Sequence, residues 1–121
     1  MLITSRQTGR WVLPKGWAKR QLTGPELAAL EAFEEAGLVG TIAEQAIGAY
    51  SYLKRLADGS AVHCEVDVFP MQVVELLDDW PEREQRQRRW FTLEEAAELV
   101  HEADLTMLLL NFGGMDAARA G

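Results

Sequence analysis

The segment from residue 23 to residue 38 constrains the fold most, because it carries a helix whose two ends are both marked. Thr23 is a capping residue type, and Pro25 suits the first position of a helix. Gly37 suits the left-handed residue that follows a helix, and the residues between these points are strong helix formers. The sequence therefore predicts a helix over residues 25–36.

Three glutamates, Glu31, Glu34 and Glu35, lie within one turn of this helix. At these spacings the side chains project from one face, and each pair of like charges destabilises an isolated helix by ~0.2–0.5 kcal/mol. A hard divalent cation would relieve the repulsion, since Mg²⁺ binds one or two carboxylates together with substrate phosphates. A solvated acidic face is the ordinary alternative for such a cluster. The choice between a cation site and a solvated face therefore depends on the surrounding residues.

The rest of the chain alternates strand and helix signals. Asp58-Gly59 predicts a hairpin turn, and Pro70 restricts its strand to an edge or ends it. Thr92 and Glu95 have the spacing of a capping box. We expect strands at 1–6, 11–13, within 42–52, within 61–74 and at 90–91, a loop over 15–24, and further helices over 92–100 and 104–112. The expected class is α+β, with a mixed β-sheet flanked by helices.

Size and charge limit the partners that we expect. A chain of 121 residues is one domain in length, so we expect a single domain over residues 1–121. The net charge of -7 gives a nucleic-acid polymer little attraction, although cations between clustered carboxylates and phosphates would admit a small anionic substrate. We expect no membrane span, no signal peptide and a cytoplasmic location. Cys64 is the single cysteine, which excludes an intramolecular disulfide.

Residues 16–38 resemble the Nudix box, whose pattern is Gly, five residues, Glu, seven residues, then Arg-Glu-hydrophobic-any-Glu-Glu-any-Gly-hydrophobic. The segment reads GWAKRQLTGPELAALEAFEEAGL. Glu31, the Glu34-Glu35 pair, Gly37 and Leu38 all fall in register with Gly16. Two positions differ from the pattern, because Leu22 stands where the first Glu belongs and Leu30 where the Arg belongs. In the family these two polar residues support the loop–helix geometry, so apolar packing is expected to replace a polar brace here.

The resemblance implies a Nudix-type α/β/α sandwich that lacks the usual first strand, and an exposed strand edge would favour a homodimer. It also implies hydrolysis of a diphosphate linkage by attack of water on phosphorus. The residues 9–16 and 89–96 look closest to the diphosphoinositol-polyphosphate and dinucleoside-polyphosphate branch. The alternative is a Nudix-like binding or regulatory domain that has lost turnover.

The resemblance assigns roles to the acidic turn. Glu31 and Glu35 are the expected principal ligands of Mg²⁺ or Mn²⁺, and Glu34 is a further ligand or the general base. Glu34 and Glu35 are therefore the expected catalytic residues. Backbone carbonyls at Lys15 or Gly16 would complete the coordination, because a glycine lets the main chain approach a metal closely.

Positive residues before the helix are the expected contacts to the substrate. Arg6, Arg10 and Lys15 lead into the predicted site and would hold phosphate oxygens of a small-molecule diphosphate. Lys19 and Arg20 in the loop are similar candidates. The charged run over residues 83–89 is interpreted as a solvated segment, and contact with phosphate is its alternative.

Overall fold

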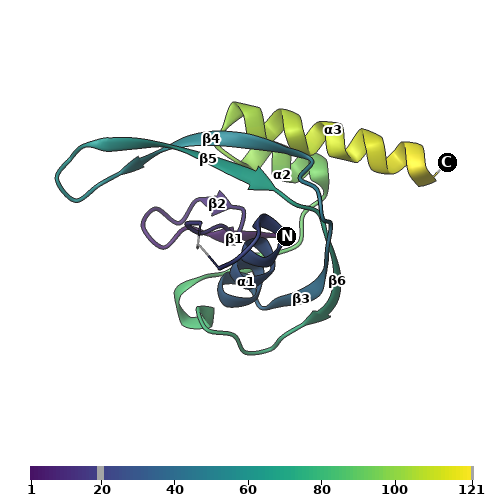
Figure 1. The fold of residues 1–121 in the computed structure, drawn as a ribbon, viewed down its shortest axis with the longest axis horizontal. Helices are drawn as coiled ribbons and strands as arrows, with labels where there is room; N and C mark the ends of the chain where they lie inside the picture. The colour runs from purple at the N-terminus through teal and green to yellow at the C-terminus, as the bar shows by residue number, and fades with distance from the viewer. Residues whose placement is uncertain (19–20, 121) are drawn as a thin grey trace.

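The computed structural model describes residues 1–18 and 21–120, with the side chains of 114–120 left aside; Lys19 and Arg20 lie outside the described residues. Strands and helices are interleaved along the chain (Figure 1). The strands are β1 (Leu2–Thr4), β2 (Trp11–Val12), β3 (Leu38–Ile42), β4 (Gly48–Arg55), β5 (Ala61–Val68), β6 (Met71–Leu76) and β7 (Arg88–Arg89). The helices are α1 (Gly24–Ala36), α2 (Leu93–Leu99) and α3 (Ala103–Ala120), with a 3₁₀ turn at Arg83–Gln85.

The strands form small antiparallel sheets. β1 lies between β2 and β7, β3 pairs with β6, and β4 pairs with β5 in a long hairpin that extends away from the rest of the molecule (Figure 1). The α+β class is therefore confirmed, but the expected single mixed sheet is not found among the described residues. β4 reaches β5 through a turn, whereas the β4–β5 hairpin separates β3 from its partner β6 in the chain. None of the described pairings is parallel.

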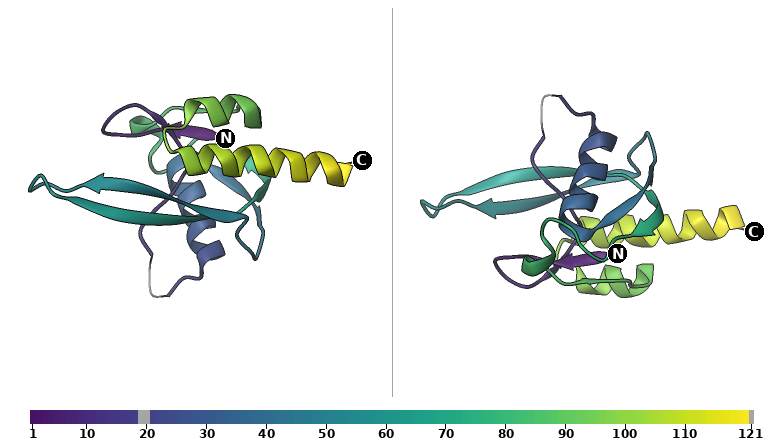
Figure 2. Two further views of the ribbon diagram at one scale, coloured as in Figure 1. Left: turned by 90° about the horizontal axis from the view of Figure 1, so that it is seen from above. Right: turned by 90° about the horizontal axis from the view of Figure 1, so that it is seen from below.

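β1 connects two separate hydrophobic clusters. Successive side chains of a strand point to opposite faces, and Leu2 and Ile3 follow this rule, since both are buried but in different clusters. Leu2 packs with residues of β4, α2 and α3, such as Leu105. Ile3 packs with Ala32 and Ala36 of α1. The helices accordingly lie on both sides of the strands, α1 on one and the α2–α3 pair on the other (Figure 2).

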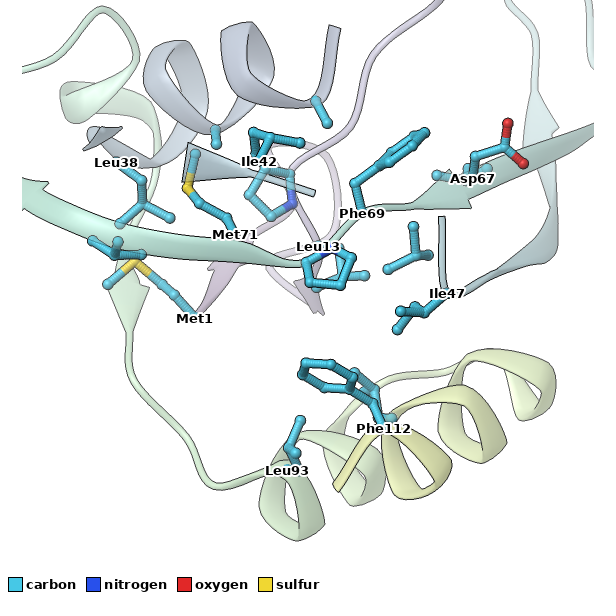
Figure 3. A pocket seen from close by; sticks show the side chains of 18 of the residues that line it. Met1, Leu13, Leu38, Ile42, Ile47, Asp67, Phe69, Met71, Leu93 and Phe112 are labelled. Carbon is cyan, nitrogen blue, oxygen red and sulfur yellow. The ribbon is translucent and has the colours of Figure 1, made fainter. Parts of the chain in front are cut away.

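Between the two clusters lies an apolar cavity of about 230 Å³. Figure 3 shows Leu93 and Phe112 of the α2–α3 layer facing Leu13, Ile42 and Met71 across it. Ala28 and Ala32 of α1 also line this space, whereas the glutamates of α1 do not. This apolar cavity is partly open to solvent, and it is distinct from the pair of carboxylates on α1.

Most expected elements are present, and three differ. The helices over 25–36 and 92–100 are confirmed as α1 and α2, and Pro70 separates β5 from β6. Strand β3 was not expected, the short strand β7 covers 88–89 instead of 90–91, and α3 continues to Ala120. No helix in the described part of the chain has both the length and the hydropathy that a membrane span requires.

Candidate metal and substrate site on helix α1

Both ends of α1 are fixed by the contacts that its sequence predicts. The Thr23 hydroxyl accepts a hydrogen bond from the Glu26 amide at 3.3 Å, and the Glu26 carboxylate accepts one from the Thr23 amide at 2.9 Å. Gly37 ends the helix with φ 67°, a left-handed conformation that glycine adopts without strain. The helix therefore holds its glutamates at defined positions.

Glu31 and Glu35 converge on the buried side of α1. Their side chains belong to residues that are only 8% and 5% exposed, and their carboxyl groups lie within hydrogen-bonding range of each other. Gly16 lies against this pair, because a Cβ at that position would overlap the Glu31 carboxylate. The loop backbone thus approaches the Glu31 carboxylate so closely that any side chain at residue 16 would displace it.

The Glu35 carboxylate also contacts two groups outside the helix. Its Oε1 accepts a hydrogen bond from the Lys15 amide at 3.3 Å and lies 3.5 Å from a guanidinium nitrogen of Arg86. Burial raises the pKa of Glu35 to about 7, an effect that the Arg86 charge opposes and the neighbouring Glu31 reinforces. Without a cation the pair therefore tends to keep a proton.

Glu34 does not join this pair. Its side chain is half-buried, and the described residues contain no group of three or more acidic, histidine or cysteine side chains arranged to hold a metal ion. The structure therefore brings together two of the three expected carboxylates, Glu31 and Glu35, next to the expected Gly16. The roles assigned to Glu31, Glu34, Glu35 and Gly16 stay predictions.

The loop over residues 15–17 is held against strand β4 by two cation–π contacts. The Lys15 Nζ lies 4.7 Å from the centre of the Tyr52 ring, and the Lys54 Nζ lies 4.6 Å from that of Trp17. Burial lowers the pKa of Lys15, while the charges of Glu35 and Glu102 oppose this change. The backbone of Lys15 therefore contacts Glu35 while its Nζ lies over Tyr52, and its expected contact with phosphate stays a prediction.

The two expected arginines lie in different places. Arg6 lines a polar groove of about 490 Å³ between β1 and the residues 84–87, and it donates a hydrogen bond to Gln85 at 2.9 Å. Arg86 lines the same groove. Arg10 instead lies 3.8 Å from the Glu102 carboxylate, near the start of α3. Arg6 thus lines a groove that it shares with Arg86, and Arg86 in turn contacts Glu35. Arg10 does not line this groove.

Arg86 is not among the site residues expected from the sequence. The run 83–89 is interpreted from the sequence as a solvated segment, but the side chain of Arg86 is only 9% exposed, so this interpretation is wrong for that residue. The one local signal was the spacing of Glu82 and Arg86, four residues apart, which form an ion pair at 2.9 Å. The contact to Glu35 joins residues far apart in the chain, and no spacing predicts it.

Fold and site together define an α+β protein in which a loop glycine lies against two buried carboxylates of a capped helix. The sequence is 36% identical to Nudix hydrolase 12, mitochondrial, of Arabidopsis thaliana over 102 residues, which are 82% of this chain and 50% of the relative. It is 34% identical to Nudix hydrolase 13, mitochondrial, of the same plant over 104 residues, 82% of this chain and 52% of the relative. No protein-family profile matches the chain.

A further similar protein is diphosphoinositol polyphosphate phosphohydrolase 3-alpha of Mus musculus, 28% identical over 102 residues, 83% of this chain and 58% of the relative. The chain spans about half the length of the curated relatives it matches. It belongs to the Nudix family.

Proposed function

We propose that this protein, acting as a single domain over residues 1–121, is a hydrolase that uses Mg²⁺ or Mn²⁺ to cleave a diphosphate linkage. The observation that carries the proposal is the buried pair of Glu31 and Glu35, against which Gly16 packs so closely that a Cβ would overlap a carboxylate. Burying two neighbouring carboxylates without a cation is unfavourable, as the raised pKa of Glu35 indicates.

The donor set fits a hard divalent cation. Glu31 and Glu35 would supply carboxylate oxygens, and the backbone at Gly16 would supply a carbonyl oxygen. Two carboxylates combined with substrate phosphates are a common arrangement for Mg²⁺. When bound, such a cation neutralises phosphate charge and lowers the pKa of a coordinated water.

The residues of the chain itself would bind and orient the diphosphate. Lys15, beside Glu35, and Arg6, in the polar groove, are placed to hold phosphate oxygens. Glu34 is the proposed acceptor of the proton from the attacking water, since its half-buried side chain lies one position from Glu35 and outside the carboxylate pair.

The substrate belongs to one of three related classes: a nucleoside diphosphate linked to another group, a dinucleoside polyphosphate or a diphosphoinositol polyphosphate. The name of the mouse relative specifies the last class for that protein, and this is the reason to include it here. A cytoplasmic location and a homodimer, both expected from the sequence, stay predictions.

The test is a panel of these three substrate classes, with release of product measured in excess Mg²⁺, in excess Mn²⁺ and in EDTA. We expect hydrolysis of at least one class with a divalent cation and none in EDTA. Glu35→Gln and Gly16→Ala should each lower kcat/KM by at least 100-fold, because the first removes a charged ligand and the second displaces Glu31.

The control variants are Glu94→Gln, which alters an exposed glutamate at the start of α2, and Gly113→Ala, whose added methyl would meet the Leu93 side chain, with its Cδ1 at 3.2 Å. Both should keep the activity of the unaltered protein. Binding of the substrates without turnover under every condition would contradict the proposal and would favour the binding or regulatory domain.

A further inference from the structure

The segment over residues 80–88 packs on the carboxyl end of α1 and supplies hydrogen-bond donors to it. The Trp80 indole donates to the Glu35 carbonyl oxygen at 3.1 Å, and the Glu82 amide donates to that of Glu34 at 3.0 Å. An Arg88 guanidinium nitrogen donates to the Ala36 carbonyl oxygen at 2.8 Å. These are the carbonyls that a helix end leaves without partners.

This end of α1 needs positive charge from elsewhere. The last turn of the helix contains two glutamates and no basic residue, although the helix dipole makes cations favourable there. Leu30 occupies the place that holds an arginine in the Nudix box. Arg86 therefore brings to the acidic face of α1 a guanidinium that the helix does not contain.

Arg86 is held so that its orientation is fixed. Its Nε donates to the Glu82 carboxylate at 2.9 Å, and one terminal nitrogen donates to the Thr4 carbonyl oxygen at 3.0 Å. The other terminal nitrogen lies 3.5 Å from Glu35 Oε1. Because two nitrogens of this planar guanidinium are hydrogen-bonded to the body of the protein, the third presents its charge to Oε1 from a fixed direction.

The two carboxylate oxygens of Glu35 differ in their contacts. The Lys15 amide and Arg86 both contact Oε1, so neither of them occupies Oε2. The ion pair of Arg86 with Glu82 is shorter than its contact with Glu35, so Glu82 balances much of the arginine charge. Arg86 therefore orients the carboxylate more than it competes with a cation for it.

We propose that Arg86 is a positioning residue, which orients Glu35 for divalent-cation binding from a segment outside the helix. The inference rests on the proposed function, because it assigns Glu35 to the cation. It extends that function by adding a residue that orients the Glu35 carboxylate and lies in neither the acidic turn nor the loop. Groups that orient a metal ligand commonly change metal affinity by 10–100-fold when they are removed.

The test measures Mn²⁺ binding to the metal-free full chain, without substrate, by the electron paramagnetic resonance signal of free Mn²⁺. We expect Arg86→Met to weaken Mn²⁺ binding by 10–100-fold and Arg86→Lys to weaken it less, since lysine keeps the charge but not the planar contacts. The control is Arg83→Met, an exposed arginine of the same segment that pairs with Asp79, and it should bind Mn²⁺ as the unaltered protein does.

Two further measurements separate the alternatives. Urea unfolding in EDTA reports the structural contribution of Arg86, and the split between KM and kcat reports any direct contact with substrate. If Arg86→Met binds Mn²⁺ as tightly as the unaltered protein, the inference is overturned. A lower free energy of unfolding would then indicate a structural role for Arg86, and a raised KM alone would indicate a contact with substrate. If Arg86→Met does not fold, the Mn²⁺ affinity of Arg86→Lys decides in the same way.

Failure of the inference is distinguishable from failure of the proposed function. If the unaltered protein hydrolyses no member of the substrate panel, the proposed function fails. If it hydrolyses a substrate and binds Mn²⁺, and Arg86→Lys and Arg86→Met bind Mn²⁺ equally well, the function stands and the role of Arg86 is wrong.

Discussion

Glu35 links the stability of the protein to pH, because the ionisation of its carboxyl group differs between the folded and unfolded chain. Its pKa is about 7 when buried and 4.5 in the unfolded reference. Between these values the folded state holds a proton that the unfolded chain has released, so the free energy of unfolding falls as pH rises. The loss amounts to about 3 kcal/mol at most.

Urea unfolding in EDTA at several pH values between 4 and 8 measures this effect. We expect Glu35→Gln to reduce the fall, and excess Mg²⁺ to reduce it in the unaltered protein, because a cation favours the ionised carboxylate. Glu94→Gln, which changes an exposed residue, should keep the full pH dependence. An identical fall in Glu35→Gln would show that another group carries it.

The sequence predicted the residues of the acidic turn better than it predicted their contacts. Helical spacing placed Glu31 and Glu35 on one face, and the structure brings their carboxyl groups together. The same spacing placed Glu34 on that face as well, although in the structure its side chain lies outside the pair. The contact of Arg86 with Glu35 could not be predicted, because it depends on how a distant segment packs.

At the scale of elements, the capping box at the start of α1 should contribute to stability without controlling the site. Removing the Thr23 hydroxyl leaves the Glu26 amide without its partner, so Thr23→Ala should lower the free energy of unfolding by about 1 kcal/mol. Thr23→Gly should cost only a few tenths of a kcal/mol. Urea unfolding measures both.

The cap lies more than one turn before Glu31, so the carboxylate pair should keep its geometry in the Thr23 variants. Well below the unfolding temperature, Thr23→Ala should therefore hydrolyse substrate within about twofold of the unaltered protein, since losses at helix ends are local. A larger loss of activity at unchanged stability would mean that the first turn takes part in the site.

Elements with local signals were predicted, and elements that depend on distant partners were not. Capping residues identified α1 and α2. Strand β3 has a glycine in its middle, and it forms because Gly40 lets the Gln72 backbone of β6 approach closely. Gly113 suggested the end of α3, but the cost of a glycine in a helix, about 1 kcal/mol, does not by itself end one.

At the scale of the whole molecule, two clusters of buried residues meet at a strand of only three residues. Leu2 and Ile3 are almost fully buried, on opposite faces of β1. The side of α1 that carries Ala32 faces one cluster, so the position of the acidic face depends on this packing. The apolar cavity between the clusters therefore leaves α1, which carries the site, less tightly packed than it would be in a filled core.

Filling this cavity should stabilise the protein. Ala28 lines the cavity from α1, and leucine is nearly as good a helix former as alanine. Ala28→Leu should therefore raise the free energy of unfolding by about 0.5–2 kcal/mol, as other cavity-filling substitutions do. Ala29→Leu, one position along the same helix and outside the cavity lining, should gain less.

Urea unfolding of both variants tests this prediction, and Mn²⁺ binding shows whether the added packing reaches the site. Because the glutamates of α1 do not line the cavity that the new side chain would fill, the Mn²⁺ affinity of Ala28→Leu should stay within about twofold. A loss of stability of more than about 1 kcal/mol would mean that the space is too small or too rigid for the extra methyl groups. The two layers would then be held apart by their own packing, and the gap would be a fixed feature of the fold.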